Sequence, residues 1–351
     1  MDFTFSEDQL LFRDSVRDFL ANEVTPERIR QRWETETGRS PDIWSALAEL
    51  GLTGMLVPEE ADGLGMNAVD FVLLAEECGR AALPEALVDH VLVATPLLES
   101  CDNEALKTQW LPKLANGEAQ AAVGHSTNPC LADAHTADLL VLSQGGDLHA
   151  LPKAAANLTA QESVDPCRKL FTVEWQPTED TLIARGKNAE KLMATTFNHG
   201  ALAAAAQMLG LAQRMIEMAV AYTSERQQFG KPVGSFQAVK HHMANVAVAT
   251  EFAKAPVYRA AYSVAHDLPA VDQHVSHAKI AAGEAAVLAA KNCIQVHGAM
   301  GYTWEVDLHI WMKRAWVLDK AWGTRGVHKS RIANAIFTGD AALGAGHTFA
   351  A

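Results

Sequence analysis

The stretch from Thr223 to Gln237, TSERQQFGKPVGSFQ, carries the residues of this 351-residue chain that are best suited to binding chemistry. Arg226 and two side-chain amides, Gln228 and Gln237, surround a Gly-Lys-Pro break between two long helical patterns. A guanidinium and amides presented at one helix corner could bind a phosphate chain. A solvated helix connection that carries a charge by chance is the alternative, and the corner alone does not decide between them.

Long helices must position this corner. Before it, Met208, Leu211, Met215, Ala219 and Tyr222 form an apolar stripe at steps of three and four. After it, a second pattern contains Pro256, where we expect a kink. The patterns and their short connections predict a C-terminal four-helix bundle, with helices over 201–225, 236–266, 275–296 and 324–339.

The rest of the chain predicts an α+β, mainly α, protein. Ser6 before two acids, and Ser40 before Pro41, mark the starts of N-terminal helices. The segment LLVLSQGGDLHAL predicts a β-hairpin within a small region of four to six strands. We therefore expect an N-terminal helical domain at 1–117 and a reduced central β domain at 118–185. The helical bundle should follow at 186–340, and a flexible tail at 341–351.

Composition narrows the function classes. The net charge of −13 argues against a nucleic-acid partner, which would require a basic face. Five scattered cysteines without a CxxC motif predict free thiols and a cytoplasmic protein. The acidic, amphipathic N-terminus is unlike a signal peptide, and no apolar run is long enough to insert into a membrane.

Four segments, by their order and spacing in the chain, resemble the acyl-CoA dehydrogenases, which are FAD enzymes that oxidise acyl-CoA thioesters to 2-enoyl-CoA. SERQQFGKPVGSFQ resembles the family's RxxFG…FQ segment, and CIQVHGAMGY resembles its QxxGGxGY loop. The alanine-rich AAQMLGLAQRMIE precedes the corner, and ELGLTGMLVPEEADGLG resembles an N-terminal segment of the family. The resemblance covers nearly the whole chain and implies an acyl-CoA dehydrogenase fold.

The resemblance also implies which residues contact FAD. It assigns Arg226 to the pyrophosphate of an FAD bound to a neighbouring subunit, and Gln237 to the same dinucleotide. A glycine in the QxxGG loop permits close backbone approach, and Ala299 here replaces the family's second glycine. The full set of expected cofactor-binding residues is Arg226, Phe229, Gln237, Gln295, Val296, Gly298 and Ala299.

The chain departs from the family where the catalytic base belongs. Dehydrogenation requires a carboxylate to remove the acyl α-proton, and the family's Tyr-Glu-Gly-Thr segment aligns with Ala321-Trp322-Gly323-Thr324. Trp322 occupies the glutamate position, and an indole N–H only donates. A subset of the family places the glutamate ahead of the first bundle helix, where this chain has Asn198-His199-Gly200-Ala201 and no acid. We therefore assign no catalytic residue.

The β region suggests a second loss. The family's TEPxxGSD-like loop, which holds the flavin ring, has no counterpart in AAVGHSTNPCLADAHTADLLVL. The residues that remain, Arg226, Gln237 and Gln295, are those that the family contributes across a subunit interface to the FAD of a neighbouring subunit. This pattern resembles one side of heteromeric α2β2 acyl-CoA dehydrogenases of steroid side-chain degradation. The hypothesis is a non-catalytic partner that completes the FAD site of a second subunit.

Other interpretations stay open. The chain could act alone as a homo-oligomer with a displaced base, for which Asp319 is a candidate, or could be a scaffold or acyl-CoA-binding protein without FAD. The histidine pairs His274/His277 and His241/His242 lack an acid or cysteine at suitable spacing, so we predict no metal site. The acyl chain cannot be named from these residues.

Overall fold

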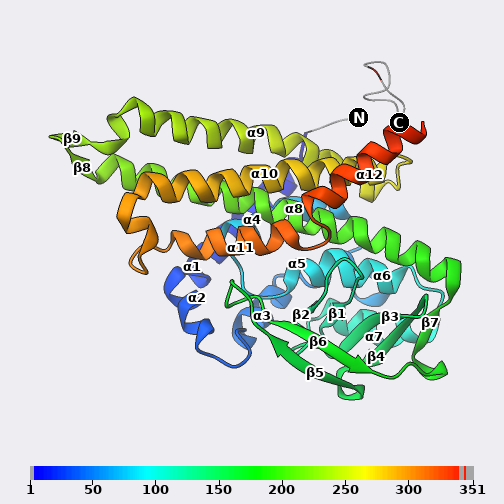
Figure 1. Ribbon diagram of the computed structural model, residues 1–351. Coiled ribbons are helices and arrows are strands. Elements are labelled where there is room, and N and C mark those ends of the chain that lie inside the picture. Colours follow the sequence, from blue (N-terminus) through cyan, green and yellow to red (C-terminus); the bar gives the residue numbers. More distant parts are fainter. Residues whose placement is uncertain (1–3, 340–343, 345–351) are drawn as a thin grey trace. The chain divides into compact units, whose positions relative to one another are not determined.

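The computed structural model describes residues 4–339 and 344, and these are mostly helical with small sheets (Figure 1). They form two compact units. The first contains the chain up to Pro26, Val72–Leu83 and the chain from Ala204 onward; the second contains Glu27–Phe71 and Pro84–Ala203. The predicted tail at 341–351 lies outside the described residues except for Gly344.

The first unit is built from long helices. α9 and α10 pack along each other, and α10 also contacts α11 and α12. Its elements are α1 (Glu7–Glu23), the end of α4 (Ala68–Arg80), most of α8 (Gly186–Glu225), β8 (Gln227–Gln228), β9 (Lys231–Pro232), the 3₁₀ turn η5 (Val233–Ser235), α9 (Gln237–Ala265), α10 (Val271–His297), the 3₁₀ turn η6 (Gly298–Tyr302), α11 (Leu308–Lys320) and α12 (Arg325–Thr338).

Local sequence explains how these helices begin. Ser6 caps α1 with a reciprocal box, in which its Oγ accepts from Gln9 N at 3.2 Å and Gln9 Oε1 accepts from Ser6 N at 2.8 Å. The predicted stripe on α8 is buried from Met208 to Ala219. Burial of this stripe is the main favourable term for the helix, since helical propensity alone contributes little.

Two features of the bundle differ from the sequence prediction. α8 begins at Gly186 rather than at Ala201, because Ala189, Leu192 and Phe197 in its first turns are buried in the second unit. α11 is an additional helix that the sequence prediction lacked. Nine of its thirteen residues are buried, so the segment shows no one-sided apolar stripe from which a helix could have been recognised.

Helices α4 and α8 cross at two glycines. A Cβ added to Gly79 would lie 2.0 Å from Gln207 O, and one added to Gly210 would lie 1.8 Å from Glu76 O. Neither position can hold a side chain without separating the helices, so the two backbones touch directly at this crossing.

The second unit combines short helices with two sheets. Its helices are α2 (Pro26–Trp33, which begins on the last residue of the first unit), α3 (Pro41–Glu49), the 3₁₀ turn η1 (Glu59–Ala61), the start of α4, α5 (Leu87–Asp89), the π-helix η2 (His90–Ala94), α6 (Thr95–Glu99), α7 (Glu104–Ala115), the 3₁₀ turns η3 (Lys153–Ala155) and η4 (Glu179–Thr181), and the start of α8.

Seven strands lie between 121 and 184, more than the four to six expected. They are β1 (Ala121–Val123), β2 (Leu131–Ala132), β3 (Leu139–Gln144), β4 (Asp147–Pro152), β5 (Ala156–Gln161), β6 (Leu170–Trp175) and β7 (Leu182–Ala184). One sheet has the order β1-β3-β4-β7 and the other β2-β6-β5, with only β1 and β3 parallel among the described strands. Leu140, Leu142 and Leu151 of the first sheet share a core with Leu158 and Phe171 of the second.

The predicted hairpin is confirmed. β3 and β4 pair from Leu139 opposite Pro152 to Gln144 opposite Asp147, around a two-residue turn. Gly145 and Gly146 have φ values of +64° and +91°, which fits the left-handed turn that joins tight hairpins. β1 and β2, with three and two residues, are too short to show alternation, which explains the undercount.

Candidate functional site

The corner after α8 is a small hairpin stabilised by the backbone. Arg226 N donates to Tyr222 O at 2.9 Å, and Arg226 O accepts from Val233 N at 2.8 Å. β8 and β9 then pair through a turn in which Phe229 and Gly230 have φ values of +53° and +76°. This hairpin projects from the ends of α8 and α9 in Figure 1. The Gly-Lys-Pro break thus forms a defined corner, as the sequence predicts.

The side chains of this corner face outward. Phe229 is 89% exposed, and Arg226 and Gln237 are also exposed. Among the described residues, the Arg226 guanidinium has no hydrogen-bond or ion-pair partner. Lys231 Nζ lies 4.4 Å from the ring centroid of Phe236, which adds a second cation to the corner. The corner therefore presents positive charge whose hydrogen-bonding capacity is unused.

The start of α9 strengthens this positive character. Its N-cap residue, Phe236, provides no side-chain acceptor for the N–H groups of the first turn, and Gln237 is the first helical residue. The N-terminus of a 29-residue helix carries a partial positive charge and free donors. The corner and this helix start together favour an anionic ligand.

The end of α10 packs against the end of α8. The rings of Tyr222 and His297 stack with centroids 4.3 Å apart, and Tyr222 OH donates to His297 O at 3.4 Å. Gln295 is exposed in the last turn, and Gly298 follows with φ +60° and ψ −139°, a conformation that glycine adopts readily. Ala299 has no positive φ, so its methyl group does not strain the loop.

The loop at 321–324 is held by buried polar groups. Trp322 is 4% exposed and adopts φ +53°, followed by Gly323 at φ +85°. His328 Nε2 lies 2.9 Å from Trp322 O, and its Nδ1 lies 3.1 Å from Ser276 Oγ. The burial of His328 lowers its pKa to about 4, so its ring is neutral near pH 7 and can donate to the carbonyl.

The other candidate acids and metal ligands do not assemble a catalytic site. Asp319 is 2% exposed and lies 2.9 Å from Arg325 Nε and 3.2 Å from Lys320 Nζ, so it is enclosed between two cations. His274 Nδ1 lies 2.7 Å from Ser263 Oγ. Within the part of the chain that the structure describes, no group of three or more His, Cys, Asp or Glu residues could hold a metal ion.

The alternative base position lies inside a helix. Asn198 to Ala201 belong to the middle of α8, not to a segment before it. His199 is half-buried, and desolvation lowers its pKa to about 4. The position at which a subset of the family carries its glutamate therefore lies within a helix of this chain rather than in a loop, and no acid stands there.

Comparison with known proteins identifies the family. Residues 6–118 match the acyl-CoA dehydrogenase N-terminal domain, and residues 191–337 match the acyl-CoA dehydrogenase C-terminal domain. The acyl-CoA dehydrogenase IpdE2 of Mycobacterium tuberculosis is 31% identical over 310 residues, which cover 88% of this chain and 91% of that protein. The chain belongs to the acyl-CoA dehydrogenase family.

Solved structures of the family share its fold. The ChsE4–ChsE5 complex of M. tuberculosis superposes with a TM-score of 0.85 at 21% identity, covering 96% of this chain and 99% of that chain. The steroid acyl-CoA dehydrogenase Tcur3481–Tcur3483 superposes with a TM-score of 0.84 at 22% identity, covering 96% and 99%. The predicted fold class is thereby confirmed. No described helix is long and apolar enough to cross a bilayer.

Family members are FAD flavoproteins, and the donor set at the corner fits part of that cofactor. A pyrophosphate requires hydrogen-bond donors and positive charge, which Arg226, Lys231 and the uncapped start of α9 provide. Built on Gly230 or Gly298, a Cβ would meet nothing within 4 Å, so the backbone at both turns is open to a ligand.

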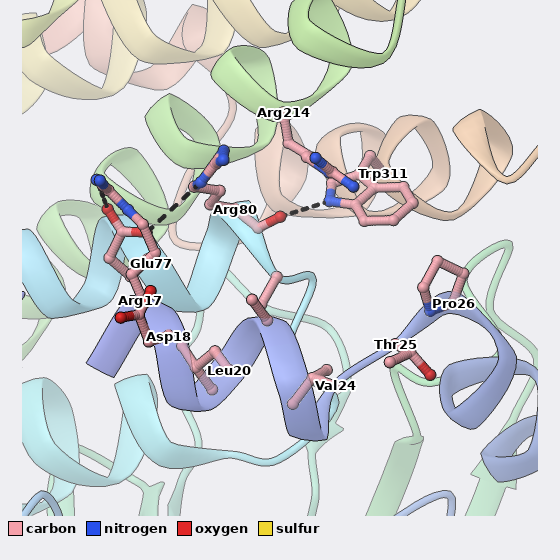
Figure 2. Close-up of a pocket in the computed structure, with 12 residues that line it drawn as sticks. Arg17, Asp18, Leu20, Val24, Thr25, Pro26, Glu77, Arg80, Arg214 and Trp311 are labelled. Atoms are coloured by element: carbon pink, nitrogen blue, oxygen red, sulfur yellow. Dashed lines mark hydrogen bonds and ion pairs between the residues drawn. The ribbon is translucent and has the colours of Figure 1, made fainter. Parts of the chain in front are cut away.

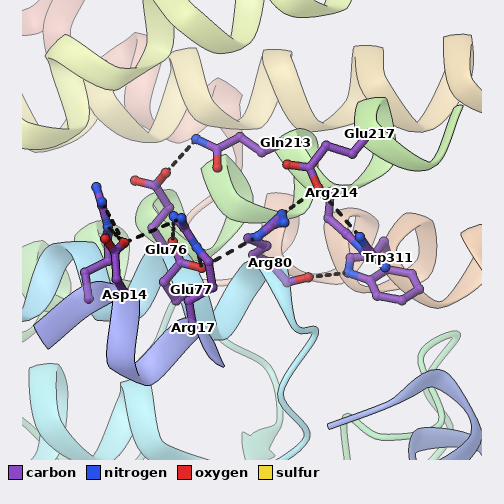
Figure 3. A network of polar contacts seen from close by, with 10 residues as sticks. Asp14, Arg17, Glu76, Glu77, Arg80, Gln213, Arg214, Glu217 and Trp311 are labelled. Atoms are coloured by element: carbon purple, nitrogen blue, oxygen red, sulfur yellow. Dashed lines mark hydrogen bonds and ion pairs between the residues drawn. The ribbon is translucent and has the colours of Figure 1, made fainter. Parts of the chain in front are cut away.

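Sequence reasoning missed a polar network on the first unit (Figure 3). The buried Glu76 accepts from Tyr258 OH at 2.9 Å and Gln213 Nε2 at 2.5 Å. Burial raises the pKa of Glu76. Its neighbour Glu77, 1% exposed, accepts two bonds from Arg17 at 2.9 and 2.6 Å. The only sequence signal was an adjacent acid pair in a predicted helix, because the partners lie 60 to 182 residues away.

Proposed function

We propose that this chain is the non-catalytic partner in a heteromeric acyl-CoA dehydrogenase, and that it completes the FAD site of a second family subunit. FAD supplies the hydride acceptor for α,β-dehydrogenation of an acyl-CoA thioester. In this proposal Arg226 and Gln237 bind the pyrophosphate, and Gln295, Val296, Gly298 and Ala299 line the adenosine side. Phe229, at the hairpin tip, covers the cofactor.

One contrast within the chain supports the proposal above all. Arg226 is exposed and its guanidinium has no partner among the described residues, as expected for a group that acts on a ligand outside its own subunit, whereas the base position holds the buried Trp322. The ChsE4–ChsE5 structure is a complex of two differently named chains, and the Tcur3481–Tcur3483 structure is called a steroid acyl-CoA dehydrogenase. We further propose that the substrate is a steroid-derived acyl-CoA and that the assembly is an α2β2 heterotetramer. Five free cysteines fit a cytoplasmic location.

The test is co-purification with a candidate acyl-CoA dehydrogenase subunit, followed by a visible spectrum and a flavin-to-protein ratio. The chain alone should retain little flavin and show no acyl-CoA oxidation, whereas the complex should be yellow and active. Stoichiometric flavin with turnover by the isolated chain would contradict the partner role and favour the enzyme with a displaced base.

A pair of arginine variants tests the site within this chain. Arg226→Ala should lower flavin retention in the complex at least tenfold, because a charge-assisted pair to phosphate is lost. Arg185→Ala is the matched control, since Arg185 is exposed and forms an ion pair with Glu179 in the second unit. Equal flavin content in both variants would support the FAD-free scaffold instead.

A further inference from the structure

The first unit contains a cavity that the proposed function does not use. It has a volume of about 310 Å³ and is bordered by the ends of α1 and α4 and by one residue each of α8 and α11 (Figure 2). The volume corresponds to roughly ten water molecules at about 30 Å³ each and lies at the lower end of the range for small-molecule sites. Arg214 on its wall is twelve residues before Arg226, roughly 18 Å along α8.

The two sides of the cavity differ in chemistry. Leu20 on α1 and Val24, the residue just after this helix, lie along one side, and Figure 2 shows Arg80, Arg214 and Trp311 on the opposite side. Trp311 is 2% exposed and its Nε1 donates to Arg80 O at 2.8 Å, which fixes the indole. An apolar wall facing a cationic wall suits a ligand with a charged head and a hydrocarbon body.

The donors of the cationic wall are only partly used. Arg17 is committed to Glu77, whose two carboxylate oxygens it binds, and Arg80 Nη1 donates to Glu217 Oε2 at 2.6 Å. The nearest acid to Arg214 is Glu217, with 3.6 Å between Arg214 Nη1 and Glu217 Oε2, and Arg214 makes no hydrogen bond to a described residue. A guanidinium has five N–H donors, so Arg214 offers unused capacity.

Arg214 is nevertheless held in place. Its guanidinium carbon lies 5.6 Å from the ring centroid of Trp311, a cation–π arrangement on a buried, hydrogen-bonded indole. Its side chain is 38% exposed, so the group remains accessible. A positioned, accessible arginine whose guanidinium donates to no described residue matches the bidentate geometry of a carboxylate.

Charge selects among anions. The residues that border the cavity include three arginines and two acids, Glu77 and the exposed Asp18, and Glu217, which bonds Arg80 and lies 3.6 Å from Arg214, is a third acid beside them. Because these acids balance the arginines, a ligand that uses the free donors of Arg214 should add a single negative charge, whereas a di- or triphosphate would add several beside the carboxylate of Asp18. We propose that the cavity binds a small organic monocarboxylate, whose carboxylate pairs with Arg214 and Arg80 and whose hydrocarbon chain packs on Ala21 and Val24.

Calorimetric titration of the purified full-length protein with hexanoate tests this proposal. Hexanoate should bind, while hexan-1-ol, which lacks the charge, and chloride, which lacks the hydrocarbon, should bind at least tenfold more weakly. Arg214→Gln should weaken hexanoate binding at least tenfold. The matched control Arg185→Gln, an exposed arginine of the second unit, should bind as the wild type does.

A second variant keeps the test independent of any folding defect in Arg214→Gln. Ala21 is an exposed residue that borders the cavity and touches none of the three ion pairs, so Ala21→Glu should fold and repel the anion. Hexanoate binding that is unchanged in both Arg214→Gln and Ala21→Glu overturns the proposal. Equal binding of hexanoate and chloride also overturns it, because it indicates a nonspecific anion only.

Discussion

Lys279 Nζ donates to the carbonyl oxygen of Gly323 at 3.2 Å, and to that of Asp319 at 3.1 Å. The two carbonyls bracket Trp322, and Lys279 is completely buried. A buried ammonium on α10 thus binds the loop in which this chain carries tryptophan where the family resemblance places glutamate. Lys279 thus holds the backbone on both sides of Trp322.

Replacing this lysine should destabilise the protein strongly. Lys279→Ala leaves two buried carbonyls without a donor and opens a cavity, at a cost of about 2–4 kcal/mol in the free energy of unfolding. Lys291→Ala, on an exposed position of the same helix, should change it by less than about 0.5 kcal/mol. Urea denaturation of both variants provides the measurement, and equal stabilities would show that the loop is not held by Lys279.

A methyl group should be costly at position 298 and nearly neutral at position 299. Gly298→Ala forces a Cβ onto φ +60° and ψ −139°, at about 1–3 kcal/mol of strain, although there is open space around it. Ala299→Gly should have little effect on the folded loop, because Ala299 has no positive φ. Thermal denaturation compares the two, and flavin retention in the complex should fall only for Gly298→Ala.

The carboxylate of Glu77 should matter more than surface ion pairs do. Glu77→Gln removes the charge to which Arg17 is bonded and which lies 3.7 Å from Arg80. We expect a loss of about 1–3 kcal/mol, below the full value for a buried pair because Arg17 is 38% exposed. Glu284→Gln, from a pair in which both side chains are about half exposed, is the control and should cost under about 0.5 kcal/mol. The free energy of unfolding of both variants should be measured at low and at high salt. Salt should reduce only the effect of Glu284→Gln, because only the exposed Glu284–Lys329 pair is screened.

Buried histidines predict a loss of stability in mild acid. His90 is 1% exposed, and burial lowers its pKa from 6.5 to about 4. Between these values the unfolded chain binds a proton that the folded protein does not, so stability falls as the pH drops from about 6.5 to 4. The full contribution is of the order of 3 kcal/mol, partly offset by Glu85, whose pKa burial raises.

His90→Gln should therefore flatten this pH dependence. The free energy of unfolding should be measured at pH 7.5, 6 and 5 for the wild type and the variant. His241→Gln, at an exposed position, should keep the wild-type slope. Identical slopes in all three proteins would show that His90 does not contribute to acid sensitivity.

Much of the fold was predictable because helix caps, the apolar stripe on α8 and the Gly145-Gly146 turn are local features. α11 was not, since burial around most of its surface removes the one-sided pattern. The first turns of α8 were missed because their apolar residues are buried within the second unit rather than continuing the predicted stripe. The short strands β1 and β2 depend on pairing partners that lie far away in the sequence.

The candidate corner was also predictable, as a break between helices with Arg226 and Gln237, and its ligand remains a prediction. The only sequence sign that the start of α9 lacks a cap is Phe236, which stands where Ser, Thr, Asp or Asn usually caps a helix. The cavity at Arg214 could not be predicted, because its walls come from four helices. Nothing in the sequence pairs Arg214 with Trp311, nearly a hundred residues later.

The glycine crossing of α4 and α8 determines the register of the polar network. Glu76 lies three residues before Gly79, and Gln213 three residues after Gly210, and their side chains meet at 2.5 Å. A slide of either helix by one residue would replace a glycine with a side chain at a contact that has no room for one. A family member that retains glycine at both positions should retain this alignment, so the pair can serve as a sequence marker for chains that share the network.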